Sequence, residues 1–233
     1  MEAKQHPLPG RRLPVFSRRM RWALWAAAAL LGIVAGVALV ALRSSSPPPA
    51  AQPEPPVGGP ATTWAAGMRP APAFRLVDQN EQPVSLAAQH GRPVIVTFID
   101  PLCRNLCPLE AQRLDAAVRS LPANVRPAVL AVSVNVYGNA RANLLQDVSK
   151  WRLVPQWRWA VGTGSQLARV WRNYGVGVQV TTKTIAGVTV HEITHTEAAY
   201  LVDRSGHERA LFLWPFTAAD VERSLRQLAA EGS

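Results

Sequence analysis

Residues 94–121 decide the fold of the domain, and they read VIVTFIDPLCRNLCPLEAQRLDAAVRSL. The apolar run at the start has no polar alternation, which predicts a strand over 93–99 that is buried on both faces. Leucines and alanines recur at helical spacing over 109–121, which predicts a helix. Cys103 and Cys107 lie where the strand gives way to the helix. We therefore expect a working site at this junction.

The same two patterns alternate along the rest of the domain. Strands are predicted at 74–77 and 84–86, which form a hairpin, at 128–134, at 158–161, and at 198–202 with 209–213, which form a second hairpin. Helices are predicted at 141–151, 166–174 and 217–230, with Thr217 as the N-cap of the last. This alternation predicts an α/β fold with a partly parallel, helix-covered sheet. Residues 176–190 are β-branched and Gly-punctuated, and they are predicted to form an inserted loop or hairpin beside the site.

The N-terminal part of the chain predicts a membrane anchor. From Trp22 to Leu42, 21 residues carry no charge, which is long enough to cross a hydrocarbon core of about 30 Å. Five arginines precede this run, so the positive-inside rule leaves them in the cytoplasm and exports everything after Arg43. The alternative is a cleaved signal peptide, whose apolar region is usually only about 7–15 residues long.

Four segments follow from these observations. They are a basic cytoplasmic N-terminus (1–21), a transmembrane helix (22–42), a linker (43–70) and one folded domain (71–233). The Pro-rich stretch 44–60 cannot bury a core and is expected to be an extended spacer. Arginine outnumbers lysine 22 to 3 and alanine is abundant, as in GC-rich bacterial genomes. We therefore predict a single-pass protein of the bacterial inner (cytoplasmic) membrane with its domain on the periplasmic side.

The net charge of +10 does not indicate a nucleic-acid partner. Residues 1–43 hold seven Lys/Arg against one Asp/Glu, which leaves 18 against 14 in the remaining 190 residues. A nucleic-acid surface needs basic residues clustered on one face with aromatic residues between them. The basic residues of the domain are instead scattered, as at Arg75, Arg92, Arg126, Arg158 and Arg209.

Cys103 and Cys107 are the only cysteines of the chain, and they are four residues apart. Residues i and i+4 of a helix share one face, and a helix N-terminus favours thiolates, so both thiol pKa values are expected to be lowered. Such thiols act as nucleophiles, as metal ligands or as both. A structural disulfide is the alternative, but such a short loop would remove little entropy from the unfolded chain.

Two stretches carry a resemblance to a known family. VIVTFIDPLCRNLCPLEAQRL resembles the strand, CxxxCP motif and helix of the Sco/SenC family, and HTEAAYLVDRSGHERALF resembles that family's later His-containing hairpin. The resemblance covers roughly residues 71–230. It implies a thioredoxin-like fold and a copper site formed by Cys103, Cys107 and His195. His191, four residues before His195, is the alternative ligand.

The expected donor set fits copper chemistry. Two thiolates and one imidazole suit Cu(I) in low coordination, whereas a closed zinc site would need a fourth ligand. The chain departs from the family pattern at Asn135, where many members have an aspartate, and at Arg104, where many have a proline. Arg104 is expected to favour the thiolates further. Asp100 is expected to be a turn residue, with support of the metal ligands as the alternative role.

Three functions remain open, and the first is favoured. The resemblance implies a copper metallochaperone for a respiratory oxidase subunit or another copper-accepting protein, in cytochrome c oxidase assembly. The second is an extracytoplasmic thiol–disulfide oxidoreductase with Cys103 and Cys107 as catalytic residues. The third is an assembly factor in which the thiols play no part. Copper binding needs His195 and disulfide exchange does not.

The remaining histidines, His6, His90 and His207, are given no role in the site. The tryptophans are expected to pack in the core.

Overall fold

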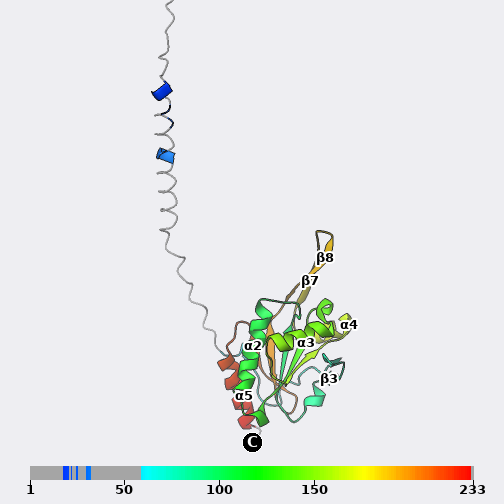
Figure 1. Cartoon of the computed structure of the whole chain (residues 1–233). Coiled ribbons are helices and arrows are strands. Elements are labelled where there is room, and N and C mark those ends of the chain that lie inside the picture. Colours follow the sequence, from blue (N-terminus) through cyan, green and yellow to red (C-terminus); the bar gives the residue numbers. More distant parts are fainter. Residues whose placement is uncertain (1–17, 21, 23–24, 26–29, 33–58, 232–233) are drawn as a thin grey trace, which may run out of the picture. The chain divides into compact units, whose positions relative to one another are not determined.

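The computed structural model describes residues 18–20, 22, 25, 30–32 and 59–231 (Figure 1). Among these residues, no helix is both long enough and apolar enough to cross a membrane. The cytoplasmic N-terminus, the membrane helix and the linker were predicted over 1–70, and most of these residues lie outside the described part. Residues 59–231 belong to one compact unit.

A six-stranded mixed sheet forms the centre of this unit. In spatial order its strands are β1 (Thr62–Thr63), β10 (Glu208–Leu213), β9 (Ala198–Val202), β4 (Val94–Ile99), β5 (Ala128–Ser133) and β6 (Trp157–Ala160). β4, β5 and β6 run parallel, whereas β9 is antiparallel to β4 and β10 is antiparallel to β9. The predicted partly parallel sheet is confirmed, and the predicted strands agree with the observed ones to within one residue at most ends.

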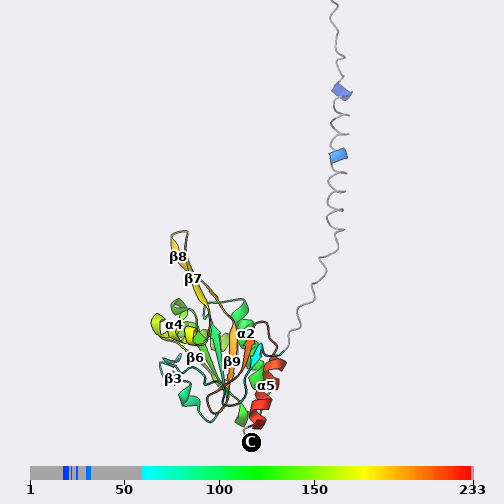
Figure 2. The same ribbon diagram turned by 180° about the vertical axis from the view of Figure 1, so that it is seen from behind.

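Helices and a hairpin cover both faces of the sheet (Figures 1 and 2). One face packs against α2 (Leu106–Arg119), α3 (Arg141–Lys150) and α5 (Ala218–Glu231). The other packs against α4 (Gly164–Asn173) and the hairpin of β2 (Arg75–Val77) and β3 (Pro83–Ser85). Three short 3-10 helices, η1 (Ala87–Gln89), η2 (Ala123–Val125) and η3 (Val136–Gly138), complete the connections.

The central strand β4 is buried at every residue because both of its faces are covered. Ile95 and Ile99 point into the core under α2 and α5, while Val96 and Phe98 point into the core on the other side. This alternation fixes the register, because a slip of one residue would exchange the two sets of side chains. The apolar run of β4 therefore holds the sheet together on both sides.

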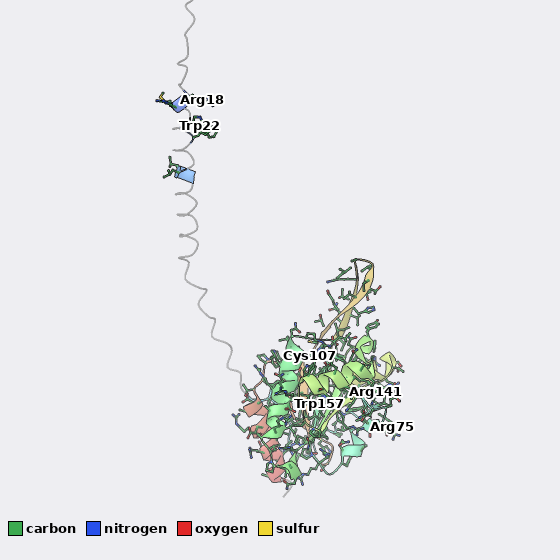
Figure 3. All side chains as sticks on the ribbon, in the orientation of Figure 1. Arg18, Trp22, Arg75, Cys107, Arg141 and Trp157 are labelled. Carbon is green, nitrogen blue, oxygen red and sulfur yellow. The ribbon has the colours of Figure 1, made fainter. Side chains whose placement is uncertain are left out.

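Most of the predicted packing of tryptophans is confirmed. Trp157 and Trp159 are buried with their ring centroids 6.4 Å apart, and Trp151 packs against Trp159 at 6.4 Å. Figure 3 shows Trp157 among the packed side chains of the domain, while Cys107 lies at the end from which a long hairpin projects. Trp214 differs, because it lines a cleft beside Cys103.

The inserted segment is a hairpin of β7 (Val178–Ile185) and β8 (Val188–His195), which pair only with each other and project from the domain (Figures 1 and 2). The turn between them has positive φ at both Ala186 and Gly187, as a type I′ hairpin turn requires. At the base of the hairpin, Thr196 N–H donates to the Gly177 carbonyl at 2.9 Å. The hairpin extends beyond the predicted range 176–190 and carries His195 at its end.

The sheet begins earlier than the sequence indicated. Residues up to 70 were assigned to the linker, but Thr62 pairs with Leu211 and Thr63 with Ala210. Without this short strand, β10 would be an edge strand with unpaired N–H and C=O groups. Two threonines carry too little apolar pattern to be recognised as a strand, so only the pairing with β10 defines β1.

Candidate metal centre

The loop that carries the first cysteine is held by Asp100, directly after β4. One oxygen of the Asp100 carboxylate accepts hydrogen bonds from the Leu102 N–H at 2.7 Å and from the Asn135 side-chain amide at 2.9 Å. The turn role predicted for Asp100 is therefore confirmed. The amide of Asn135 can donate to this carboxylate, whereas an aspartate here would bring a second acceptor-only group beside it when ionised. Asn135 thus ties the ends of β4 and β5 together.

The two cysteines do not share a helix face as predicted. Asn105 is the N-cap of α2, so Cys107 lies in the first turn while Cys103 precedes the helix. The Cys107 backbone N–H instead points at Cys103 Sγ, with the two atoms 3.4 Å apart. The helix also begins three residues before the predicted position, because Asn105 accepts a hydrogen bond from the Leu106 N–H at 2.8 Å.

The two thiols have opposite acidities. A hydrogen bond from the Cys107 thiol, together with backbone N–H groups of the first turn, lowers the pKa of Cys103 to about 5. The same hydrogen bond raises the pKa of Cys107, and burial raises it further. The prediction that both thiol pKa values are lowered is therefore wrong for Cys107. Cys103 is half-buried and is the more acidic thiol, whereas Cys107 is buried and is the weaker acid.

Arg104 stabilises the loop that carries Cys103 through hydrogen bonds and an ion pair. Its guanidinium donates to the carbonyls of Pro101 and Cys103, both at 2.9 Å, and pairs with the buried Asp147 at 3.3 Å. Hydrogen bonds, and not this charge, are the main causes of the low pKa of Cys103. The expected role of Arg104 in favouring the thiolate is replaced by a role in shaping the loop.

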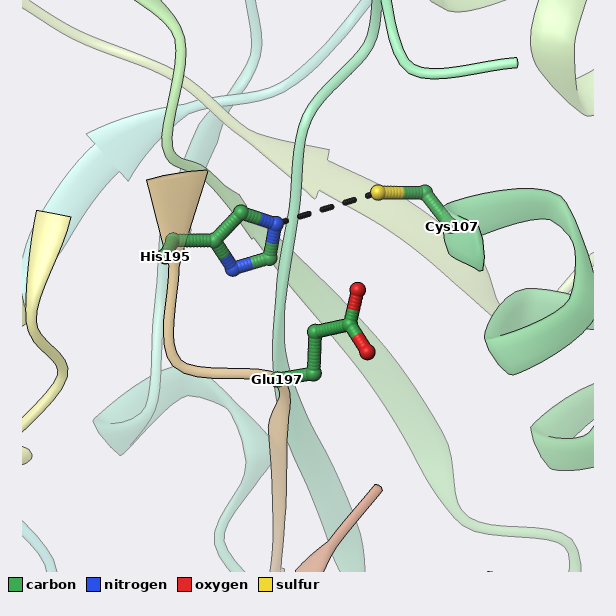
Figure 4. Close-up of side chains that lie close together, drawn as sticks. All are labelled: Cys107, His195 and Glu197. Atoms are coloured by element: carbon green, nitrogen blue, oxygen red, sulfur yellow. Dashed lines mark hydrogen bonds between the residues drawn. The ribbon is translucent and has the colours of Figure 1, made fainter. Parts of the chain in front are cut away.

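His195 approaches Cys107 from the far end of the sequence. Its Nε2 lies 3.8 Å from Cys107 Sγ, and a dashed line joins these two atoms in Figure 4. Its Nδ1 lies 3.1 Å from the Thr196 carbonyl oxygen. A carbonyl only accepts, so Nδ1 carries the proton and the lone pair of Nε2 faces Cys107. Burial lowers the pKa of His195, so its neutral form is favoured. A neutral imidazole with its other nitrogen anchored is the usual form of a metal-binding histidine.

Glu197 completes the cluster and was not predicted. Ligand atoms of Cys107, His195 and Glu197 all lie within 4.8 Å of one another. Figure 4 shows the carboxylate beside the gap between the imidazole and the thiol. Burial and the nearby Cys103 raise the pKa of Glu197. Its position two residues after His195 was the available signal, because residues i and i+2 of an extended chain point to the same side.

His191 does not reach the cysteines. Its ring stacks on Tyr137 with the centroids 3.7 Å apart and the planes 6° from parallel, and its Nδ1 lies 3.0 Å from the Thr182 hydroxyl. The structure therefore brings His195 to Cys107, with Cys103 lining the same cleft as His195, and leaves the alternative ligand His191 stacked on Tyr137. The stack on Tyr137 holds the hairpin against the segment that follows β5.

These residues fit a metal ion. The 3.8 Å between Cys107 Sγ and His195 Nε2 is shorter than the sum of a sulfur–metal and a nitrogen–metal bond, about 4.3 Å for zinc. One ion can therefore contact both atoms without moving them apart. Cys103, His195, Glu197 and Trp214 also line an open cleft of about 520 Å³, which gives access to the site.

The fold and this site define a thioredoxin-like α/β protein with a cysteine–histidine cluster suited to a metal. Residues 65–230 match the SCO1/SenC family, and the chain belongs to that family. None of the curated proteins matches the chain.

Several solved structures share the fold. ScoI of Bradyrhizobium japonicum with copper bound is 21% identical, with a TM-score of 0.59 over 68% of this chain and 98% of that chain. Yeast Sco1 with copper bound is 17% identical, with a TM-score of 0.61 over 70% of this chain and 90% of that chain. BsSco, described by its disulfide switch and as a member of the Sco family of cytochrome c oxidase assembly proteins, is 16% identical, with a TM-score of 0.56 over 73% and 98%.

The unequal thiols predict selective alkylation. In the reduced, metal-free chain, iodoacetamide should modify Cys103 about tenfold faster than Cys107 at pH 6, since only the thiolate reacts and Cys107 is buried. The rate at Cys103 should be half-maximal near pH 5. Trypsin cleaves after Arg104, so mass spectrometry reads the two cysteines in separate peptides. Equal rates, or faster modification of Cys107, would contradict the assigned acidities.

A buried carboxyl group on α2, that of Glu110, makes stability depend on pH. The Thr97 hydroxyl lies 2.7 Å from the Glu110 carboxyl and 3.2 Å from the Ala198 carbonyl. One hydroxyl has one proton and the carbonyl can only accept, so we infer that Glu110 is protonated and donates to Thr97. Burial raises the pKa of Glu110 from 4.5 to about 8.

Glu110→Gln should remove this pH dependence. The folded pKa lies above the unfolded value, so the folded chain keeps a proton that the unfolded chain releases, and stability falls as pH rises from about 4.5 to about 8. The glutamine stays neutral throughout. Urea unfolding of the reduced chain at pH 5, 6, 7 and 8 should give wild-type free energies that decline relative to the variant. Parallel profiles would show that Glu110 is ionised in the folded chain.

Proposed function

We propose that this protein binds copper at Cys103, Cys107 and His195 and delivers it to a copper-accepting protein, a respiratory oxidase subunit in cytochrome c oxidase assembly. The observation that carries the proposal is the 3.8 Å approach of His195 Nε2 to Cys107 Sγ, with Cys103 Sγ 3.4 Å from the Cys107 backbone nitrogen. Membership of the SCO1/SenC family supports it, as do the copper-bound structures of ScoI and yeast Sco1. BsSco is named as belonging to a family of assembly proteins for the same oxidase.

The donor set explains both capture and release. Two sulfur ligands and one imidazole favour Cu(I), a soft ion that accepts low coordination. The proton that Cys107 holds in the metal-free chain must leave when copper binds and returns when copper leaves. A raised thiol pKa therefore makes copper easier to release. Cys103 faces the open cleft, where a ligand of the acceptor can replace it first.

A specific observation also supports the second function, thiol–disulfide exchange. The half-buried Cys103 thiolate would attack a disulfide of the partner, forming a mixed disulfide and releasing one partner thiolate. Cys107 would then attack Cys103, so that this chain ends as the disulfide and the partner as the dithiol. The disulfide switch described for BsSco is in line with such chemistry. This reaction needs no histidine.

Cu(I) titration separates the two functions. The full-length chain in detergent, reduced and without oxygen, should take one copper from a competing chelator. His195→Ala and Cys103→Ala should each weaken binding by about 100-fold or more, because removal of an outer-shell partner of a metal ligand already costs 10–100-fold.

The matched control for this titration is His191→Phe, which keeps an aromatic ring for the stack on Tyr137 and removes the nitrogen donors. It should retain the wild-type affinity. A wild-type chain that cannot compete for Cu(I) would rule out delivery and leave the redox function. A loss in His191→Phe equal to that in His195→Ala would overturn the choice of ligand.

We further propose that residues 22–42 anchor the chain in the bacterial cytoplasmic membrane, with the domain over 71–233 on the periplasmic side. The uncharged run and the arginines before it support this arrangement. The full-length chain should stay in the membrane pellet after alkaline carbonate extraction with its N-terminus intact, and alkaline phosphatase fused after Ser233 should be active. Release of a shortened chain would indicate a cleaved signal peptide instead.

A further inference from the structure

The carboxylate of Glu197 lies beside the candidate metal ligands Cys107 and His195. Its oxygen, Cys107 Sγ and His195 Nε2 lie within 4.8 Å of one another, although the three residues come from two distant parts of the chain (Figure 4). The main chain holds this residue in place, because the Trp214 N–H donates to the Glu197 carbonyl at 3.2 Å and β9 begins one residue later. The side chain therefore starts from a fixed point at the rim of the sheet.

This carboxylate is not engaged elsewhere. Across residues 59–231, no N–H or O–H group donates a hydrogen bond to it and no Lys, Arg or His forms an ion pair with it. Asp100 and Asp147, which also lie near the site, are occupied, since Asp100 binds Asn135 and Asp147 pairs with Arg104. A half-buried carboxylate that has no protein partner and lies among metal-binding atoms is available to a cation.

We propose that Glu197 is the fourth ligand of this site when it holds a divalent cation, and that Cu(I) is held without it. This inference rests on the proposed copper site at Cys103, Cys107 and His195. Two sulfurs, one imidazole nitrogen and one carboxylate oxygen make a four-donor set of the kind that zinc takes in proteins. Three of these donors, those of Cys107, His195 and Glu197, already lie within 4.8 Å of one another. Cys103 lines the same cleft as His195 and Glu197.

The chemistry of the donor atoms distinguishes a divalent cation from Cu(I). Carboxylate oxygen is a hard donor that contributes little to soft, low-coordinate Cu(I) but binds borderline divalent ions well. Two thiolates and a carboxylate together carry three negative charges, which a divalent ion balances better than a monovalent one in a partly buried site. Glu197 should therefore raise divalent affinity much more than Cu(I) affinity.

Three metal probes test this in the full-length, reduced chain without oxygen. Zn²⁺ and Cu(I) affinities are measured by competition with chelators, and Co²⁺ is read from its visible absorption, which reports the donor set. Glu197→Gln should weaken Zn²⁺ binding by about tenfold or more and Cu(I) binding by less than about threefold, and it should alter the Co²⁺ bands. Glu192→Gln makes the same charge change at an exposed residue paired with Lys183, and it should change none of the three.

The other outcomes are equally decisive. An unchanged Zn²⁺ affinity in Glu197→Gln, or an equal loss of Zn²⁺ and Cu(I), would overturn the assignment. A weaker Zn²⁺ affinity with unchanged Co²⁺ bands would also overturn it, because Glu197 would then act through its charge alone. Failure of the proposed copper function is read separately, as the absence of Cu(I) binding by the wild-type chain.

Discussion

The approach of His195 to Cys107 depends on the antiparallel pairing of β4 with β9. In this register Val96 lies opposite Tyr200 and Thr97 opposite Ala199, so the end of β4 and the start of β9 meet at one edge of the sheet. The cysteine loop follows β4 and His195 precedes β9, so two segments about 90 residues apart are brought to one point. A slip of one residue would turn β9 over and disrupt this edge. The buried side chains of β4, which fix this register, therefore position the candidate metal ligands as well as the core.

Two further contacts stabilise this edge of the sheet. Asn135 donates to Asp100 and so joins the end of β5 to the loop that leads to Cys103. His191 stacks on Tyr137, in the 3-10 turn after β5, and holds the projecting hairpin close to the same end of the domain. Both contacts use the segment directly after β5. This segment lies where the family pattern has an aspartate that this chain lacks, and here it provides support through an amide and a ring.

The unequal thiols explain why copper transfer and disulfide exchange are hard to separate from geometry alone. A half-buried thiolate beside a buried, protonated thiol suits a nucleophile with a resolving partner, and it equally suits a site that releases its metal by taking a proton back. The two functions are distinguished by the residues at and just after the end of β8. His195 and Glu197 add donors that disulfide exchange does not use, and their placement favours metal chemistry.

The sequence by itself determined the order and type of the elements, because apolar periodicity is a local property and the runs in β4, β5 and α2 are long and regular. It also predicted the cysteine pair at a strand–helix junction, and the resemblance to the Sco/SenC family implied His195 as a ligand. Only the tertiary structure decided that Cys103 is acidic and Cys107 is not, that Asn135 replaces a carboxylate as a support, that Thr62–Thr63 extend the sheet, and that Glu197 faces the site. The Asn135–Asp100 contact needs β4 paired with β5, the Glu197 cluster needs β4 paired with β9, and β1 exists only beside β10. The acidities of the two cysteines depend on hydrogen bonds at the start of α2 and on the burial of Cys107 in the folded core. Apolar periodicity does not encode these contacts.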